Sequence, residues 1–367
     1  MSMASVSLNL WEFMYGIAHW LMADIIGPIF GWLGFQGFES WLASAGVLVF
    51  LQFVFVALAV FIVGFLINIT MIWQERKILG RLMDRRATQV GPIGYFQNIA
   101  DGLKTFLKEI IIPESADVAV FNAVPVIYIG SSILLLATIP LSSGFRMSQS
   151  DLGVLLTFAI FGVAPFAVLL GGWAANNKYT LIGGMRAAAQ IIAYEIPMLL
   201  TVVAVVIMAG SLSFGDIVAY QSENIWLVIP LIIGFFVFII AIVAEVERVP
   251  FDLPEAEAEL VEGWGTEYGG MRFGLIMLAD YFRGYAGAAV ATLLFLGGWI
   301  GPFPDIIPEE VWFLAKVFIV FSVFIWIRGA MPRVRTDQIL HIGWKRLLPL
   351  SVVNIFIAIA LKTLGWF

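Results

Sequence analysis

Long apolar runs separated by short polar segments are the feature that most constrains how this chain of 367 residues can fold. Each run is close to the ~20 residues that a helix needs to cross the hydrocarbon core of a bilayer. Lipid offers no hydrogen-bond partners, so a crossing segment must satisfy its own backbone groups, and runs of this length do so as α-helices. The sequence therefore predicts an all-α, polytopic transmembrane helix bundle of about eight spans. The predicted spans are 42–73, 115–140, 152–173, 187–209, 225–246, 273–299, 311–330 and 347–366.

The composition agrees with this prediction and excludes several classes of protein. Of the residues, 61% are hydrophobic and 13% are charged, whereas a soluble domain has about 25% charged residues. A disordered chain, a nucleic-acid-binding protein and an ordinary soluble enzyme are therefore excluded. The chain has no Cys and only two His, His19 and His341, so thiolate, iron–sulfur and transition-metal sites are not expected. Any redox centre must then sit on another chain, and no covalently bound cofactor is expected.

The N-terminal part of the chain differs from the rest. It contains Trp11, Trp20 and Trp32, and tryptophan is typical of the membrane–water interface. We therefore expect 1–40 to be an interfacial N-terminal extension, with a ninth span as the alternative, and 41–367 to be a single integral-membrane domain. Most of the 20 Lys and Arg residues fall on one set of loops, which the positive-inside rule places in the cytoplasm. Both termini then lie on the outer side.

The first cytoplasmic segment contains a predicted amphipathic helix from Gly94 to Glu109. Its apolar residues fall on one face, and its polar residues, among them Asp101, fall on another. Two interpretations are open. The helix is either a surface anchor whose lysines reach toward water, or a cap over a cavity with Asp101 directed at polar partners. The apolar face comprises Phe96, Ile99, Leu103, Phe106 and Leu107.

The third cytoplasmic loop is the most unusual segment. Between Glu245 and Glu267 it holds eight acidic residues against a single base, Arg248. Acidic runs are usually solvated, but this one is interleaved with Pro, Phe, Leu and Trp, and Glu245 and Glu247 close an apolar span. We therefore expect the loop to pack against the protein. Crowding and burial raise the pKa of carboxyl groups, which would prepare them to exchange protons near neutral pH.

Two further acids lie inside predicted spans, Glu195 in the fourth and Asp280 in the sixth. Acids at membrane depth are costly and usually face the interior of a bundle or a water-filled path, which favours a functional interpretation. The structural alternative is that Arg186 or Arg283 simply neutralises one of them. The polar segment 173–186 is predicted to be a short loop that docks a partner.

Two of these segments resemble one known family. Gly94 to Glu109, and Pro250-Phe251-Asp252 through Gly263, stand in the same order among the spans as in the quinone-site membrane subunit of respiratory complex I. The bacterial form of this protein is called the H subunit and the mitochondrial form is called subunit 1, and archaeal F420H2 dehydrogenases contain relatives of it. The resemblance covers roughly residues 45–365.

The resemblance implies a membrane subunit that forms the access tunnel for quinone and begins an acidic relay coupling quinone reduction to proton translocation. Its partners would be the hydrophilic-arm subunits, which carry the terminal iron–sulfur cluster and the flavin, together with antiporter-like and small membrane-arm subunits. It would act as an enzyme only within an NADH:quinone-type oxidoreductase, in the plasma membrane of a prokaryote rather than in an organellar or thylakoid membrane.

Two alternatives to this function stay open. One is the same role in an archaeal complex that is fed by F420H2 or ferredoxin and reduces methanophenazine. The other belongs to a different class, a standalone carboxylate-lined ion transporter.

The resemblance also implies roles for individual residues. Family residues near the quinone tunnel correspond here to Arg76, Arg85, Asp101 and Phe273. Family acids of the proton relay correspond to Glu195, Glu245, Glu255, Glu257, Glu259, Glu267 and Asp280. Asp280 stands where the family usually has Glu. No residue is implied as catalytic on this chain alone, and none as a metal ligand.

The sequence departs from the family pattern at two places. The family often has Arg-x-Gly-Pro-Asn after the first span, whereas here Arg85 is followed by Arg86-Ala87-Thr88-Gln89 and the stretch is one residue shorter. This leaves the type of quinone open. Some members carry Glu in the third span at the position of Gly162, so any proton path here must do without that carboxyl.

Overall fold

The computed structural model describes residues 10–21, 45–146, 150–252, 254, 257–302 and 306–365. Within these ranges every regular element is a helix, which confirms the predicted all-α class. Six helical stretches are long and apolar enough to cross a membrane, as a polytopic membrane protein requires. These stretches are Val49–Leu82, Val118–Thr138, Gly153–Ala174, Lys178–Ala209, Glu309–Ala330 and Thr336–Thr363.

Six of the predicted spans overlap these stretches. They contain α4 (Ala45–Leu82), α6 (Val118–Thr138), α7 (Gly153–Phe161) with α8 (Ala164–Ala174), α9 (Lys178–Ala209), α14 (Glu309–Ala330) and α16 (Leu348–Thr363). However, α4 ends nine residues later and α9 begins nine residues earlier than predicted. The other two predicted spans hold α11 (Ile232–Glu245), which has only 14 residues, and α13 (Gly270–Phe295), which carries Asp280 and Arg283 in its middle. The total of eight spans therefore stays a prediction.

Short helices connect or flank the long ones. They are α1 (Leu10–His19), η2 (Pro92–Gly94), α5 (Gln97–Phe106), α10 (Phe214–Glu223), α12 (Glu257–Leu260), η4 (Gly263–Gly265), α15 (Thr336–Ile342) and the π-helical turn η5 (Gly343–Leu347). The predicted amphipathic helix is α5, and it begins later than expected because Gly91, Ile93 and Gly94 all have a left-handed φ. Its apolar side chains are exposed on the isolated chain, including Leu103 and Phe106.

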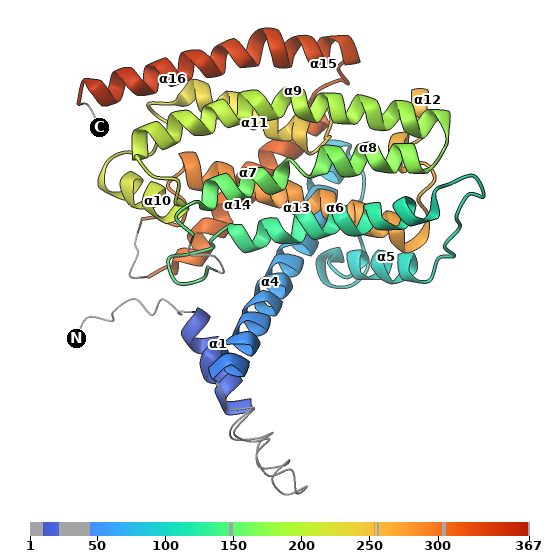
Figure 1. Cartoon of the computed structure of the whole chain (residues 1–367), viewed down its shortest axis with the longest axis horizontal. Coiled ribbons are helices and arrows are strands. Elements are labelled where there is room, and N and C mark those ends of the chain that lie inside the picture. Colours follow the sequence, from blue (N-terminus) through green and yellow to red (C-terminus); the bar gives the residue numbers. More distant parts are fainter. Residues whose placement is uncertain are drawn as a thin grey trace, which may run out of the picture.

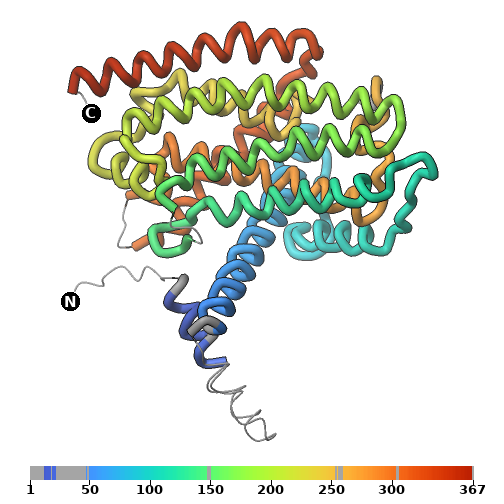
Figure 2. Tube along the Cα trace, viewed as in Figure 1, coloured from blue at the N-terminus to red at the C-terminus, as the bar shows by residue number. Residues whose placement is uncertain are grey.

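The long helices form a bundle in which most members are nearly parallel. Figure 1 shows α6, α8, α9 and α16 running side by side, whereas α4 crosses the bundle obliquely. Helix α9 packs against α8, α11 and α16. The N-terminal half of α4 leaves the bundle, and α1 lies beside it there (Figure 2). The expected interfacial position of 1–40 and the possible ninth span fall largely outside the described residues, because 10–21 is all of that segment the structure describes.

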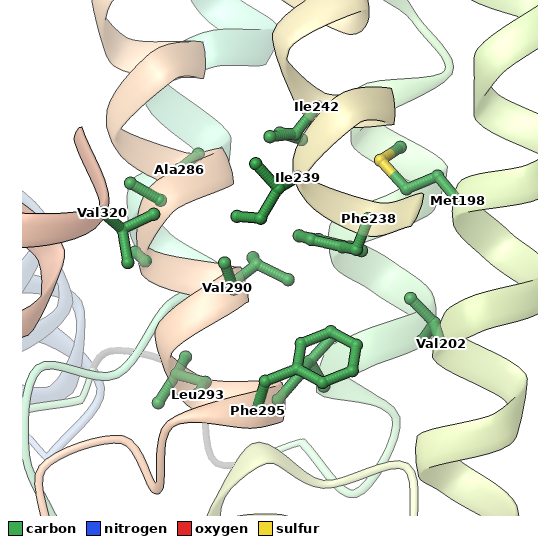
Figure 3. Packing of buried hydrophobic residues seen from close by; sticks show 14 of the residues in the cluster. Met198, Val202, Phe238, Ile239, Ile242, Ala286, Val290, Leu293, Phe295 and Val320 are labelled. Atoms are coloured by element: carbon green, nitrogen blue, oxygen red, sulfur yellow. The ribbon is translucent and has the colours of Figure 1, made fainter. Parts of the chain in front are cut away.

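The main hydrophobic core includes the region where α9, α11, α13 and α14 meet. Its side chains point toward one another from all four helices (Figure 3). The labelled members are Met198 and Val202 of α9, Phe238, Ile239 and Ile242 of α11, Ala286, Val290, Leu293 and Phe295 of α13, and Val320 of α14. Small residues on α13, such as Ala286 and Gly287, let this helix approach α11 closely; a Cβ added at Gly287 would lie 2.2 Å from Ile242 Cγ1.

A second close approach joins α8, α9 and the turn η4. A Cβ added at Gly172 would lie 2.5 Å from the carbonyl oxygen of Thr180, and one added at Gly183 would lie 2.8 Å from Gly263 Cα. Backbone atoms cannot move aside as the end of a flexible side chain can, so these positions accept only glycine in this packing. The contact places η4, the end of the acidic loop, directly against the bundle.

We expect G172A to destabilise the protein by about 1–3 kcal/mol, because the added methyl forces α8 and α9 apart. The measurement is thermal unfolding of the purified complex in detergent. The matched control is G130A in α6, where an added Cβ meets no atom within 4 Å. If both variants unfold at the wild-type temperature, the close contact of α8 and α9 does not contribute as described.

The predicted docking loop at 173–186 is wrong for most of its length, because α9 already begins at Lys178. The side chain of Asn177 caps this helix by accepting a hydrogen bond from the backbone N–H of Tyr179 at 3.1 Å. Polar and glycine-rich composition suggested a loop, but the glycines serve helix packing. Gly184 of α9 packs against Gly172 of α8, and a Cβ added at Gly184 would lie 3.3 Å from Gly172 Cα.

Candidate functional site

A buried carboxylate near the C-terminal end of α4 joins three parts of the chain. Glu75 is 3% exposed, and its two carboxylate oxygens each accept a hydrogen bond of 2.7 Å from Arg248. Arg328, at the end of α14, also donates to Glu75. The guanidinium of Arg248 stacks over the ring of Tyr281 at 4.3 Å. We call Glu75, Arg248 and Arg328 the α4 clamp, because they tie α4, α14 and the start of the acidic loop together.

The α4 clamp stays ionised because its charges compensate one another. Burial by itself would lower the pKa of Arg248, but the charge of Glu75 outweighs this and raises the pKa above its usual range. A buried charge with a hydrogen-bonded partner avoids the cost of an isolated one. Glu75 was not among the site residues predicted from the sequence, although an acid at the end of an apolar span, directly before Arg76, was a signal for it.

The next residue of α4, Arg76, forms an ion pair with Asp101 of α5. Gln97 also donates to Asp101 at 3.2 Å. Partial burial raises the pKa of Asp101, but the hydrogen bonds from Arg76 and Gln97 and the charge of Arg76 lower it below its usual value overall. Helix α5 is held against α4 by further polar contacts, including a hydrogen bond of 3.0 Å from the Asn98 side chain to the Ile69 carbonyl.

The residues expected near the tunnel are partly brought together. Arg76 and Arg85 line one cavity of about 420 Å³ with Arg86, Ala87, Thr88, Gln89 and Gln97, and Asp101 adjoins it through its contact with Arg76. Phe273 lies on α13, half-buried. The residue after it, Gly274, packs against Thr105 of α5, with 2.8 Å from an added Cβ to Thr105 Cγ2. Phe273 therefore stands on the helix that supports α5 rather than on the wall of the arginine cavity.

Two acids expected in the relay, Glu245 and Asp280, lie deep in the bundle. Glu245 accepts a hydrogen bond of 2.5 Å from Arg283, and the two side chains are 0% and 1% exposed. Arg283 also reaches the Phe161 carbonyl at 3.5 Å, at the break between α7 and α8. Asp280 instead accepts a hydrogen bond of 2.6 Å from the hydroxyl of Tyr128. Arg283 thus pairs with Glu245, although Asp280 is only one helical turn away on the same helix.

The third membrane acid, Glu195, is half-buried on α9 and lies beside the break in the third span. A Cβ added at Gly162 would stand 3.1 Å from Glu195 Oε1. The glycine at this position therefore leaves room for the carboxyl of Glu195. The structural alternative that Arg186 neutralises a membrane acid is not seen among the described residues, because Arg186 pairs with Glu259 at 2.8 Å.

The acidic loop packs against the protein, as expected. Phe251, Leu260 and Trp264 are 6%, 4% and 1% exposed. Tyr268 stacks on Phe121 of α6 with ring centroids 4.2 Å apart. Gln190 of α9 fixes the start of the loop by donating to the carbonyls of Ala244 at 2.9 Å and Phe251 at 2.8 Å. The loop is therefore part of the folded core at its two ends.

Two further acids that were expected in the relay, Glu259 and Glu267, are less buried. Glu259, paired with Arg186, is 54% exposed, and Glu267 accepts a hydrogen bond of 2.7 Å from Asn177. Glu255 lies outside the described residues, and Glu257 is described only as the backbone start of α12.

A buried acid that the site prediction omitted is Glu247. It is 7% exposed and has a left-handed φ of 52°. Burial, together with the negative charge of Asp280, raises the pKa of Glu247 to about 8, against the opposing effects of the Trp264 indole and Arg283. The sequence signal was the spacing Glu245-Val246-Glu247 at the end of an apolar span, which placed two acids where burial begins.

These side chains can move charge but cannot carry electrons. The carboxyls of Glu195, Glu245, Glu247 and Asp280 all lie within range of the charge of the buried Arg283, and Asp280 also lies within range of the charge of Arg248. In a low dielectric, carboxyls that outnumber the nearby cations favour the protonated form. In the described ranges no group of His, Asp and Glu side chains is arranged to hold a metal ion.

The fold and these buried acids define a polytopic membrane protein with an internal chain of ionisable groups. Comparison with known proteins gives a specific family. The family model described as NADH dehydrogenase matches residues 53–359. The H subunit of NADH-quinone oxidoreductase from Bacillus cytotoxicus is 46% identical over 318 residues, covering 85% of this chain and 95% of the relative.

Other relatives agree with this result. The corresponding protein of Anoxybacillus flavithermus is 46% identical over 79% of this chain and 88% of the relative, and that of Bacillus thuringiensis is 45% identical over 85% and 95%. The chain belongs to the H-subunit family of NADH-quinone oxidoreductases, which are membrane subunits of the multisubunit oxidoreductase complex I. The resemblance stated from the sequence is thereby confirmed.

Proposed function

We propose that this chain forms the quinone access tunnel of a complex I-type oxidoreductase and begins the acidic relay that couples quinone reduction to proton translocation. The observation that carries the proposal is the pair of neighbouring ion pairs at the end of α4. Arg76 contacts Asp101, which we assign to the tunnel, and Glu75 contacts Arg248 at the start of the acidic loop. One rigid helix end therefore links the two sets of charges.

The mechanism is electrostatic. Reduction of a quinone consumes protons and creates transient negative charge near Arg76 and Asp101. The charge change reaches the acidic loop through the α4 clamp, because an ion pair shared between elements responds to charge on either side. Glu245, Asp280 and Glu195 then change protonation and pass the change toward neighbouring membrane subunits. Buried carboxyls whose charge is only partly compensated are suited to this role.

The substrate that fits best is a quinone. The relatives are named as the H subunits of NADH-quinone oxidoreductases, which favours quinone over methanophenazine and NADH over F420H2 or ferredoxin as the donor. Their membership of a multisubunit enzyme argues against a standalone ion transporter. The cluster-bearing hydrophilic-arm subunits and the antiporter-like and small membrane-arm subunits would be the partners, with iron–sulfur and flavin centres on those chains. The plasma membrane of a bacterium would be the location.

We expect E195Q and E245Q each to lower the number of protons translocated per quinone reduced at least about twofold, because a glutamine cannot hold a transferable proton. The complex should still assemble, since each glutamine keeps the size of the side chain. Proton uptake and NADH oxidation are measured together in inside-out membrane vesicles. The control is E262Q, an exposed acid of the same loop. Wild-type stoichiometry in both relay variants would refute the relay.

A further inference from the structure

Glu247 is buried at the point where the acidic loop leaves α11. Its backbone N–H donates to the Ala244 carbonyl at 3.2 Å, which closes the helix end and keeps the residue inside the protein. A left-handed φ is costly for a residue with a Cβ, and such conformations gather at functional sites. Carboxylate oxygen Oε1 of Glu247 is buried and accepts no hydrogen bond from the described residues. This oxygen is therefore available to carry a proton.

The charged and titratable groups around Glu247 come from three elements besides its own. Asp280 and Arg283 belong to α13 and Tyr128 belongs to α6, while Glu245 precedes Glu247 on the same segment. The indole of Trp264, on η4, also acts on Glu247.

The available cations near Glu247 are already engaged. Arg283 donates to Glu245, and Arg248, next to Glu247 in sequence, donates to Glu75. No arginine or lysine of the described residues forms an ion pair with Glu247 or Asp280. Two buried carboxyls without a paired cation repel one another when both are charged in a low dielectric, which favours a single proton between them.

We propose that Glu247 is a further proton carrier of the relay, and that Glu247 and Asp280 together hold one proton that passes between them. The proposal rests on the relay function proposed above. In the transfer, the O–H bond of one carboxylic acid breaks and a new O–H bond forms on the other carboxylate, so the charge of the pair stays constant. The hydroxyl of Tyr128 hydrogen-bonds to Asp280 and stabilises its ionised form. The proton therefore rests on Glu247.

Glu247 gives this chain a proton path that differs from that of family members with a Glu at the position of Gly162. The third span has no other carboxyl to replace the one missing at Gly162. Glu195 of α9 occupies the space next to this glycine. Glu247 instead adds a carboxyl at the cytoplasmic end of α11, between Asp280 and the acidic loop. Protons would then pass from the loop through Glu247 to Asp280.

The first test observes the proton directly. Infrared difference spectra of the purified complex are recorded across pH, and the carbonyl stretch of protonated carboxylic acids is followed. We expect a component that disappears with a midpoint near pH 8, since the pKa of Glu247 is raised to about 8 and the group is neutral below it. The component should be absent from E247Q and present in E262Q. A spectrum unchanged by E247Q overturns the proposal.

The second test measures function in the complete complex. E247Q should lower the protons translocated per quinone reduced at least about twofold, while E247D, which keeps a carboxyl, should retain most of the translocation. If E195Q and E245Q lose translocation but E247Q does not, Glu247 is not a proton carrier, although the proposed relay through the other acids still stands. Normal translocation in all three would overturn the relay itself. If E247Q does not assemble, infrared titrations of the wild type and E247D still test the proposal. E247D must shift the pH midpoint of the carboxylic acid component, and an unchanged midpoint overturns the proposal.

Discussion

Replacing Arg283 with methionine is expected to lower the free energy of unfolding by about 3–5 kcal/mol, because Glu245 would stay buried without its cation. Both side chains are almost fully excluded from solvent, and their atoms are 2.5 Å apart. Arg283 also approaches the Phe161 carbonyl at the break between α7 and α8, so the variant loses a donor at that break as well. The amount of assembled complex on native gels and its thermal unfolding in detergent measure the effect.

The double variant E245M/R283M distinguishes an uncompensated charge from a general packing defect. Replacing a buried ion pair by apolar residues of similar volume is often neutral or stabilising. We therefore expect the double variant to recover most of the lost stability, while proton translocation stays impaired because the Glu245 carboxyl is gone. An R283M protein that unfolds at the wild-type temperature would show that the pair does not hold α11 and α13 together.

Removing the carboxylate of the α4 clamp is expected to have the second largest effect. E75A leaves Arg248 and Arg328 without their shared partner, and loss of one member of a buried ion pair typically costs about 3–5 kcal/mol. Since Arg248 begins the acidic loop, the loop should also become more mobile. We expect faster proteolytic cleavage between Arg248 and Glu262, and less assembled complex, with both followed on gels.

The matched control is R333Q. Arg333 also contacts the start of the loop, by an ion pair of 3.0 Å to Asp252, but its side chain is 49% exposed. Exposed ion pairs contribute about 0–1 kcal/mol. R333Q should therefore assemble and resist proteolysis nearly as the wild type does. Equal effects of E75A and R333Q would mean that burial of Glu75 is not what makes the clamp important.

The sequence predicted the acids of the site better than it predicted their partners. Glu195, Glu245 and Asp280 stood out because a charge in an apolar run is rare and costly. Their partners could not be assigned, since Arg283 joins Glu245 across 38 positions and Tyr128 joins Asp280 across 152. Such distant pairs depend on which helices become neighbours.

The segment boundaries also differ in how far the sequence predicts them, since some depend on local composition and others on tertiary contacts. The ends of most spans were predicted to within a few residues, because bilayer thickness fixes the length of an apolar helix. The segment 173–186 was taken for a loop because local composition does not show that Gly183 and Gly184 pack against η4 and α8. The break of the third span into α7 and α8 was not predicted either; its apolar composition is continuous across Gly162.

The sequence by itself determined that this chain lies in a membrane as an α-helical bundle, since its apolar runs leave no other way to satisfy the backbone in lipid. It also determined how many acids the bundle must accommodate and in which segments. The tertiary structure alone decided which acids have a paired cation and which do not. Arg283 pairs with Glu245 and Arg248 pairs with Glu75, whereas the buried Glu247 has no ion-pair partner among the residues that the structure describes. Ionisation in a low dielectric depends on neighbours a few ångströms away, and the fold supplies those neighbours.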